Sequence, residues 1–182
     1  MQVLKEEVRQ RIIKSARREF KKHGFEKASM RSIASSANMT VGNLYRYYKN
    51  KEDLYGAIIG SLFDEIKSLK SNMPEEPESR LNYLLDGFKE LQKDHRSEWL
   101  TLFGGSTGTK FQKVADDLHV VLRDTLMDVL KKNDRRPEIA VPVASAIIYG
   151  LNTILKSEKD KSGDLADDFL NYMMVDIANR VA

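Results

Sequence analysis

The sequence predicts an all-α protein with two domains, one at residues 1–50 and the other at residues 51–182. Apolar residues recur at helical spacing over most of the chain, and no sustained alternation of apolar and polar residues marks a strand. The four prolines, at positions 74, 77, 137 and 142, leave long stretches free for helices. The net charge also changes sign. Residues 1–50 carry 12 Lys and Arg against 4 Glu, a net of +8, and residues 51–182 carry 18 Lys and Arg against 23 Asp and Glu, a net of −5.

The composition excludes several classes of protein. The 182 residues are 41% hydrophobic and 31% charged, which is enough to bury a core in an ordinary soluble domain. No cysteine is present, which excludes disulfides, thiolate catalysis and zinc held by sulfur. The longest apolar run, residues 139–151, is shorter than the roughly 20 residues that a membrane span needs. We therefore expect a buried helix there, no membrane partner and a cytoplasmic location.

The first fifty residues are predicted to form three helices. The apolar stripe of the first helix consists of Leu4, Val8, Ile12, Ala16 and Phe20. Gly24 follows it where a left-handed cap is expected. A second helix is expected over 30–37, a tight turn over 38–40, and a third helix over 41–48 with Thr40 as its N-cap.

The remainder is predicted to be helical as well. The expected helices run over about 51–69, 79–93, 98–103, 110–132, 137–156 and 165–180. Asn50 and Asp164 are the expected caps of the first and last of these, and Pro137 suits the first turn of the helix that it opens. Residues 104–108 and 156–163 are expected to be loops.

The helices at 30–37 and 41–48 have the spacing of a helix-turn-helix, whose second helix enters the DNA major groove. The exposed side of that second helix is predicted to present Gly42, Asn43, Tyr45 and Arg46. A glycine permits close approach, an amide and a guanidinium can reach base edges, and a phenol can reach a phosphate. Two alternatives remain on these residues alone: an ordinary pair of short helices, or a basic membrane-surface helix.

A denser pattern covers about a quarter of the chain. Its residues are Ile12, Ile13, Ala16, Phe20, Gly24, Phe25, Ser29, Met30, Ile33, Ala34, Ala37, Met39, Thr40, Gly42, Leu44, Tyr45, Tyr48, Lys51, Glu52 and Leu54. From Arg11 to Leu54 the sequence thus resembles the TetR-type bacterial transcriptional regulators. It departs from them at Asn38, where the family usually has glycine, and at Tyr48, where it usually has phenylalanine. Asparagine tolerates a left-handed conformation, so the turn can survive.

The resemblance implies an N-terminal three-helix helix-turn-helix DNA-binding domain and a C-terminal helical ligand-binding and dimerisation domain. It implies a homodimeric repressor that binds a double-stranded, near-palindromic operator and is released by an unidentified small-molecule effector. Positions that typically hold phosphates correspond to Thr40, Tyr45, Tyr47 and Lys51. Positions at or near base edges correspond to Arg31, Val41, Gly42 and Asn43. Arg46 is added from its place on the helix.

Two further sets of residues are assigned less directly. The aromatics Phe63, Phe88, Trp99, Phe103 and Tyr149 suit a plain core, or the effector cavity that the resemblance implies. The expected dimer interface consists of Ala140, Ala144, Ile148, Leu151, Phe169, Tyr172 and Met173. The helix over 137–156 is apolar on nearly all sides and must be covered, either by a partner subunit or as the central helix of a monomeric core.

No catalytic or metal site is expected. Asp116 and His119 share a helix face but have no evident third ligand, so a surface pair is the better interpretation. The segment 104–110 resembles a phosphate loop but has no glycine before its lysine and no preceding strand. We therefore expect no enzyme, no cofactor and no metal. The rival hypotheses are an all-helical enzyme or carrier, which salt-dependent DNA binding would exclude, and a constitutive DNA binder, which a closed apolar cavity would argue against.

Overall fold

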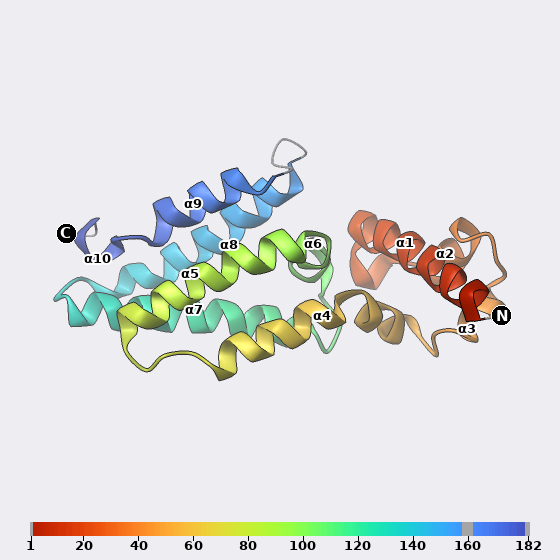
Figure 1. The fold of residues 1–182 in the computed structure, drawn as a ribbon, viewed down its shortest axis with the longest axis horizontal. Coiled ribbons are helices and arrows are strands. Elements are labelled where there is room, and N and C mark those ends of the chain that lie inside the picture. The colour runs from red at the N-terminus through yellow and green to blue at the C-terminus, as the bar shows by residue number, and fades with distance from the viewer. Residues whose placement is uncertain (1, 158–161, 181–182) are drawn as a thin grey trace. The chain divides into compact units, whose positions relative to one another are not determined.

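The protein is described here by a computed structural model that covers residues 2–157 and 162–180, in which the chain forms helices and no strand (Figure 1). The predicted all-α class is confirmed. The helices are α1 Gln2–Lys27, α2 Met30–Ser36, α3 Val41–Tyr45, α4 Lys51–Ser71, α5 Pro77–Asp94, α6 Arg96–Gly105, α7 Gln112–Lys132, α8 Ala140–Lys156, α9 Asp164–Met174 and α10 Ile177–Arg180, with a 3-10 turn η1 at Pro137–Ile139.

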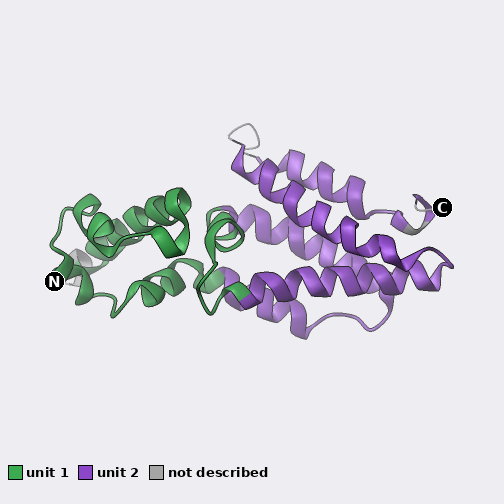
Figure 2. Cartoon of the chain, turned by 180° about the vertical axis from the view of Figure 1, so that it is seen from behind, with its two compact units in different colours: residues 1–61, 97–112 green, residues 62–96, 113–182 purple. Residues whose placement is uncertain are grey.

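The helices group into two compact units, shown in green and purple in Figure 2. Unit 1 consists of residues 1–61 and 97–112, and unit 2 of residues 62–96 and 113–182. This division by packing differs from the boundary expected after residue 50. The first part of α4, most of α6 and the segment that follows α6 belong to unit 1. Tyr55 of α4 and Phe111, just after α6, lie there with their ring centroids 5.8 Å apart.

The core of unit 1 is built on the predicted apolar stripe of α1. Ile12, Ala16 and Phe20 are buried, together with Ile33 of α2 and Leu44 of α3. The side chain of Leu4 lies outside the described part of the structure.

The predicted end of the first helix at Gly24 is a break in its regular geometry. Gly24 has a φ of 70°, although helical hydrogen bonding resumes as far as Lys27. A Cβ on Gly105 would lie 2.9 Å from the Cα of Gly24, so the two backbones touch. Only glycine at position 105 permits this approach of α6 to α1.

Unit 2 is a layered helical bundle in which α9 packs against both α5 and α8. The start of the last helix is predicted one residue too late, since Gly163 at φ 88° is the N-cap and Asp164 already belongs to the first turn. The predicted continuous helix to Arg180 is also wrong, because the chain turns at Val175 and Asp176, where Asp176 has a φ of 56°. Most of the expected loop over 156–163 lies outside the described residues.

Candidate nucleic-acid interface

The helix α3 begins at a side-chain cap. The Thr40 hydroxyl accepts a hydrogen bond from the Asn43 backbone N–H at 3.2 Å, as the sequence predicts. Leu44 is fully buried and anchors α3 to α2. The regular helix ends at Tyr45 and not at Tyr48 as predicted, so Arg46 lies at its C-cap. At 1.5 Å per residue, α3 is about 7.5 Å long, so the surface that it can present to a ligand is short.

The turn between α2 and α3 depends on Asn38. Its φ of 56° is left-handed, which asparagine tolerates better than other side chains except glycine. The Met39 N–H donates to the Ala34 carbonyl at 3.0 Å and closes the end of α2. The departure from the usual glycine therefore leaves the turn intact.

The residues predicted to meet DNA all belong to unit 1, between α2 and the start of α4, but differ in exposure. Those that are exposed are Arg31, Thr40, Gly42, Asn43, Tyr45 and Arg46, and those that are half-buried are Val41, Tyr47 and Lys51. A Cβ on Gly42 would meet nothing within 4 Å, so the fold itself does not require glycine there. The open space in front of Gly42 is available to a ligand that approaches the backbone.

Lys51 has a structural role that sequence reasoning missed. Its Nζ donates to the carbonyl oxygens of Glu26 and Ala28, both at 3.1 Å, and lies 4.5 Å from the centre of the Phe25 ring. These contacts place a positive charge at the C-terminal end of α1, where carbonyls lack partners in the helix. An ammonium has three donors, so one remains for a phosphate.

Glu19 is a second residue that the sequence did not single out. Its carboxylate accepts hydrogen bonds from the Ser29 N–H at 3.1 Å and from the Ser32 hydroxyl at 2.9 Å. It thereby ties α1 to the start of α2 and fixes the orientation of the helix-turn-helix. The only sequence signal was one acidic residue within a basic segment.

Tyr48, the other departure from the family pattern, is half-buried. Burial raises the pKa of its phenol, while the charge of Arg9 lowers it and that of Glu6 raises it. Partial exposure leaves the residue in contact with solvent, so the extra hydroxyl is accommodated.

The comparisons with known proteins agree with this geometry. The sequence profile of the family described as "Bacterial regulatory proteins, tetR family" matches residues 12–58. The regulator UidR of Escherichia coli strain K12 is 34% identical over 160 residues, which cover 83% of this chain and 81% of UidR. The chain belongs to the TetR family. The matched relatives are HTH-type transcriptional regulators.

Other similarities are shorter or more distant. The repressor KstR of Rhodococcus jostii is 32% identical over 90 residues, or 48% of this chain. The chain spans only 42% of the length of KstR, and 46% of that of another curated relative. The solved structure of the ketosteroid regulator KstR2 of Mycobacterium tuberculosis has a TM-score of 0.66 at 16% identity, covering 91% of this chain and 92% of that one. At this identity it shows the TetR fold alone.

The five aromatics considered for an effector cavity of this TetR-family chain are divided between the two units. Trp99 and Phe103 belong to unit 1 and stack with centroids 4.3 Å apart, whereas Phe63, Phe88 and Tyr149 belong to unit 2. Trp99 and Phe88 are fully buried, and Tyr149 is 76% exposed. A groove of about 250 Å³ in unit 2 is lined by other residues, namely Glu78, Leu81, Asn82, Val129, Asn133, Met174, Asp176, Ile177 and Asn179.

The residues expected at the TetR-family dimer interface divide between the inside and the outside of unit 2. Ala140, Ala144 and Leu151 are fully buried within the chain. Ile148, Phe169 and Met173 are half-buried, and the Phe169 ring lies so close to Gly150 that a Cβ there would come within 2.3 Å of it. Tyr172 is 73% exposed.

Proposed function

We propose that this chain is a DNA-binding transcriptional regulator: a homodimeric repressor that binds a near-palindromic operator and leaves it when a small-molecule effector binds. The observation that carries the proposal is the exposed surface of α3, where Asn43 and Arg46 stand free beside Gly42 on a capped helix. Amide and guanidinium groups suit adenine and guanine edges in the major groove. We assign contacts with phosphates or neighbouring bases to Thr40, Tyr45, Tyr47, Lys51 and Arg31.

The proposed dimer rests on an uncovered apolar surface. Tyr149 of α8 and Tyr172 of α9 are each about three-quarters exposed, and Val141, Leu165 and Val175 are about half exposed. The two helices pack against each other, so their exposed apolar residues suit one shared interface. A two-fold dimer presents two copies of the α3 surface, and we therefore expect an operator with two related half-sites.

The helix α8 is also relevant to where in the cell the protein is located. By length and composition, the segment Pro137–Lys156 could cross a membrane, with a mean hydropathy of 1.5 and 28% of its window buried in the chain. The core helix of a soluble protein passes the same test. A partner subunit would cover the exposed part, so we propose a cytoplasmic dimer that binds DNA.

The proposal also includes control by an effector and a separate function for each domain. Residues 1–50 would read DNA, and residues 51–182 would hold the effector and the dimer interface. The dimer would adopt two states that differ in the distance between its two α3 helices. A ligand can shift the protein between these states only by binding them unequally, and a hundredfold preference corresponds to about 2.7 kcal/mol. Trp99, stacked on Phe103, is the single tryptophan and would report a nearby effector by fluorescence.

The deciding experiment is selection of DNA from a random pool by the purified protein, followed by sequencing and by sedimentation of the complex. We expect a near-palindrome bound by two chains. A single asymmetric site bound by one chain would contradict the dimeric reading. Reporter transcription that rises when the operator is deleted would support repression, and transcription that falls would identify an activator.

The rival function is a constitutive DNA binder without an effector. A small-molecule screen, scored by Trp99 fluorescence and operator release together, separates the two. A screen in which no ligand releases the protein from the operator favours the constitutive binder.

A further inference from the structure

The outer side of α1 carries a row of positive charges that the helix-turn-helix does not use. Its members, which we call the α1 stripe, are Arg11, Lys14, Arg18, Lys21 and Lys22, and all are exposed. With 3.6 residues per turn they fall within a sector about 100° wide and extend over about 16 Å. That sector lies opposite the buried side of α1, which holds Ile12, Ala16 and Phe20.

The side chains of the stripe have no acidic partner among the residues that the structure describes. None of them has an ion pair or a side-chain hydrogen bond there. Glu19 is the only acid between Arg11 and Lys22, and it bonds Ser29 and Ser32 instead. In the same helix Arg17, outside the stripe, is paired with Glu98. Several cations of unit 2 are likewise paired, as Lys70 is with Asp117 and Arg80 with Asp128.

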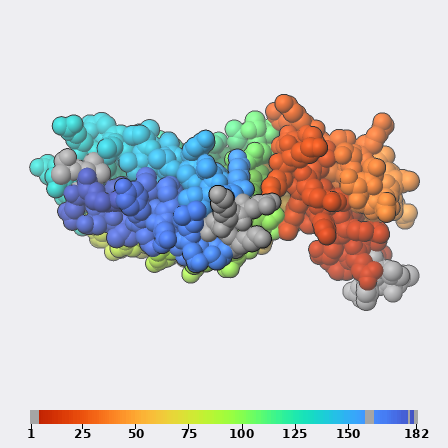
Figure 3. All heavy atoms as spheres, turned by 90° about the horizontal axis from the view of Figure 1, so that it is seen from above, coloured from red at the N-terminus to blue at the C-terminus, as the bar shows by residue number. Residues whose placement is uncertain are grey.

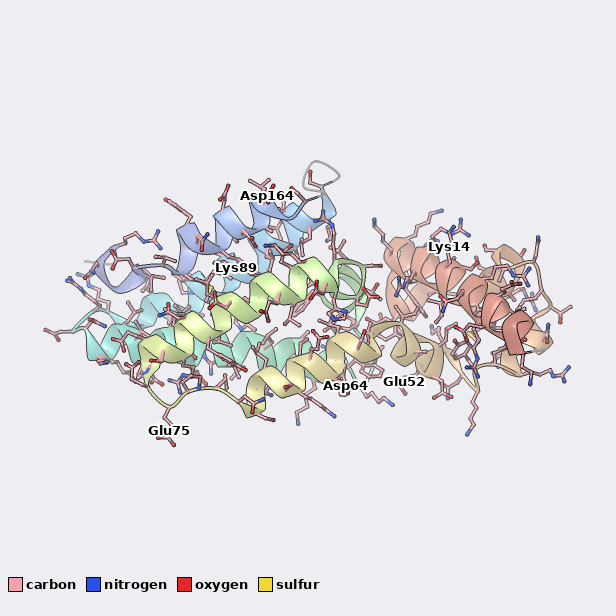
Figure 4. All side chains as sticks on the ribbon, in the orientation of Figure 1. Lys14, Glu52, Asp64, Glu75, Lys89 and Asp164 are labelled. Carbon is pink, nitrogen blue, oxygen red and sulfur yellow. The ribbon has the colours of Figure 1, made fainter. Side chains whose placement is uncertain are left out.

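The stripe lies on a freely accessible surface. Figure 3 shows α1, in red, uncovered along much of its length, and Figure 4 places Lys14 on the outer side of the helix. The helix α2 packs on the inner side of α1, and α3 packs on α2. The core of unit 1 therefore separates the stripe from the surface that α3 offers to DNA.

We propose that the α1 stripe binds the phosphate backbone of duplex DNA beyond the segment that α3 contacts. This proposal rests on the DNA-binding function and extends it. A row of unpaired lysines and arginines suits a phosphate track, since each neutralised phosphate releases counterions. A membrane surface suits it less well, because the apolar side of α1 is buried in the core and cannot enter a bilayer. The DNA is either the bent flank of the bound operator or a second duplex.

The test compares two triple variants that remove equal charge. One is Lys14→Gln with Lys21→Gln and Lys22→Gln in the stripe. The control is Lys113→Gln with Lys131→Gln and Lys156→Gln, three exposed lysines of unit 2. Both are titrated with the short selected operator, and with the same operator lengthened by two helical turns, about 20 bp, at each end. A labelled duplex of scrambled sequence is also added to each preformed complex.

If the α1 stripe binds the flank of the operator, the stripe variant binds the short operator like the control. It then lacks the additional affinity that the parent protein has for the long operator. Between 50 and 200 mM salt, the parent should then lose about 40-fold more affinity per chain than the variant, from three phosphate contacts at a slope of roughly 0.9 each. If the α1 stripe binds a second duplex, the complex formed by the stripe variant does not bind the scrambled duplex, whereas the complex formed by the control does.

Equal behaviour of the two variants in both DNA arms would overturn the proposal. So would a stripe variant that keeps both DNA activities but no longer binds phosphatidylcholine vesicles with about 30% phosphatidylserine, since the partner would then be a membrane. Operator recognition itself is tested by changes at Asn43 and Arg46 on the short duplex, so that failure of the stripe and failure of base reading are distinguishable.

Discussion

The Tyr55 hydroxyl donates a 2.8 Å hydrogen bond to the main-chain carbonyl of Thr101 and joins α4 to α6 within unit 1. Tyr55 is fully buried, and its ring meets Phe20 and Phe25 edge-on with centroids 5.1 and 5.4 Å away. The Lys110 N–H donates to the Glu52 carboxylate at 2.9 Å and adds a second link. Residues 97–112, remote in sequence from α1–α3, are therefore part of the unit that contains α3.

The burial of Tyr55 predicts a loss of stability at alkaline pH. Burial raises the pKa of Tyr55 above the ordinary value of 10.0, so the folded state keeps the proton more tightly than the unfolded state. The stabilising contribution is complete below pH 10.0 and is lost progressively as the pH rises above it. The free energy of unfolding, measured by urea denaturation from pH 8 to pH 11, about the unfolded phenol's pKa, should fall steeply at the upper end.

Tyr55→Phe should cost about 1 kcal/mol at neutral pH through the lost hydrogen bond, and should flatten this alkaline decline. Tyr48, whose pKa burial also raises, and Lys93 and Lys132, whose pKa values are raised by hydrogen bonds to carboxylates, are then the remaining sources. The control Tyr149→Phe changes an exposed phenol and should leave the decline as in the parent. An undiminished decline in Tyr55→Phe would remove Tyr55 as its cause.

Base reading by α3 is expected to be concentrated in two residues. Replacing Asn43 or Arg46 by Ala should weaken binding to the selected operator by about 1–3 kcal/mol, because each side chain offers hydrogen bonds to base edges. Binding to a scrambled duplex should change much less. Fluorescence anisotropy with both duplexes measures the difference, and Lys131→Ala in unit 2 is the control. An Arg46→Ala protein with the operator affinity of the parent would exclude Arg46 from base reading.

Lys51 is expected to affect both folding and DNA binding. Lys51→Met removes the donor to the Glu26 and Ala28 carbonyls and should lower the free energy of unfolding by about 1–3 kcal/mol. It should also weaken binding to all DNA sequences alike and reduce the salt slope by about 1 if its third donor meets a phosphate. Thermal unfolding and salt titrations measure the two effects. Lys49→Met, at an exposed neighbour, should leave the melting temperature unchanged.

The dimer is best tested at residues that the monomer leaves exposed. Phe169 packs against Gly150 within the chain, so Phe169→Glu would damage the fold itself. Tyr149→Glu and Tyr172→Glu place a charge where a partner would bury it, without disturbing a buried side chain. Sedimentation should detect at least a hundredfold rise in the dimer dissociation constant, about 2.7 kcal/mol, with weaker operator binding.

Val120→Glu on α7 introduces the same charge at an exposed apolar residue outside α8 and α9, and should leave the dimer intact. Parent protein that sediments as a monomer at micromolar concentration would end the dimer hypothesis. Equal weakening by Val120→Glu would instead place the interface on α7 as well.

The sequence by itself determined the features that depend on neighbours a few residues apart. The apolar residues Ile12, Ala16 and Phe20 determined the buried side of α1. Thr40 determined the start of α3 by accepting a hydrogen bond from the N–H of Asn43, three residues further along the chain. The left-handed turn was implied by the glycine that TetR-type regulators usually have at position 38, and asparagine tolerates that conformation because its side chain is short and polar.

Only the tertiary structure decided which sides of the later helices are covered. The segment 137–156 is apolar on nearly all sides, so its periodicity could not predict that Ala144 is buried while Tyr149 is exposed. Nor could the sequence predict that Lys51 would cap α1, or that Thr101 would accept a hydrogen bond from Tyr55, 46 residues away. Local patterns specify a helix and its ends, whereas burial and pairing depend on contacts between residues that are distant in sequence.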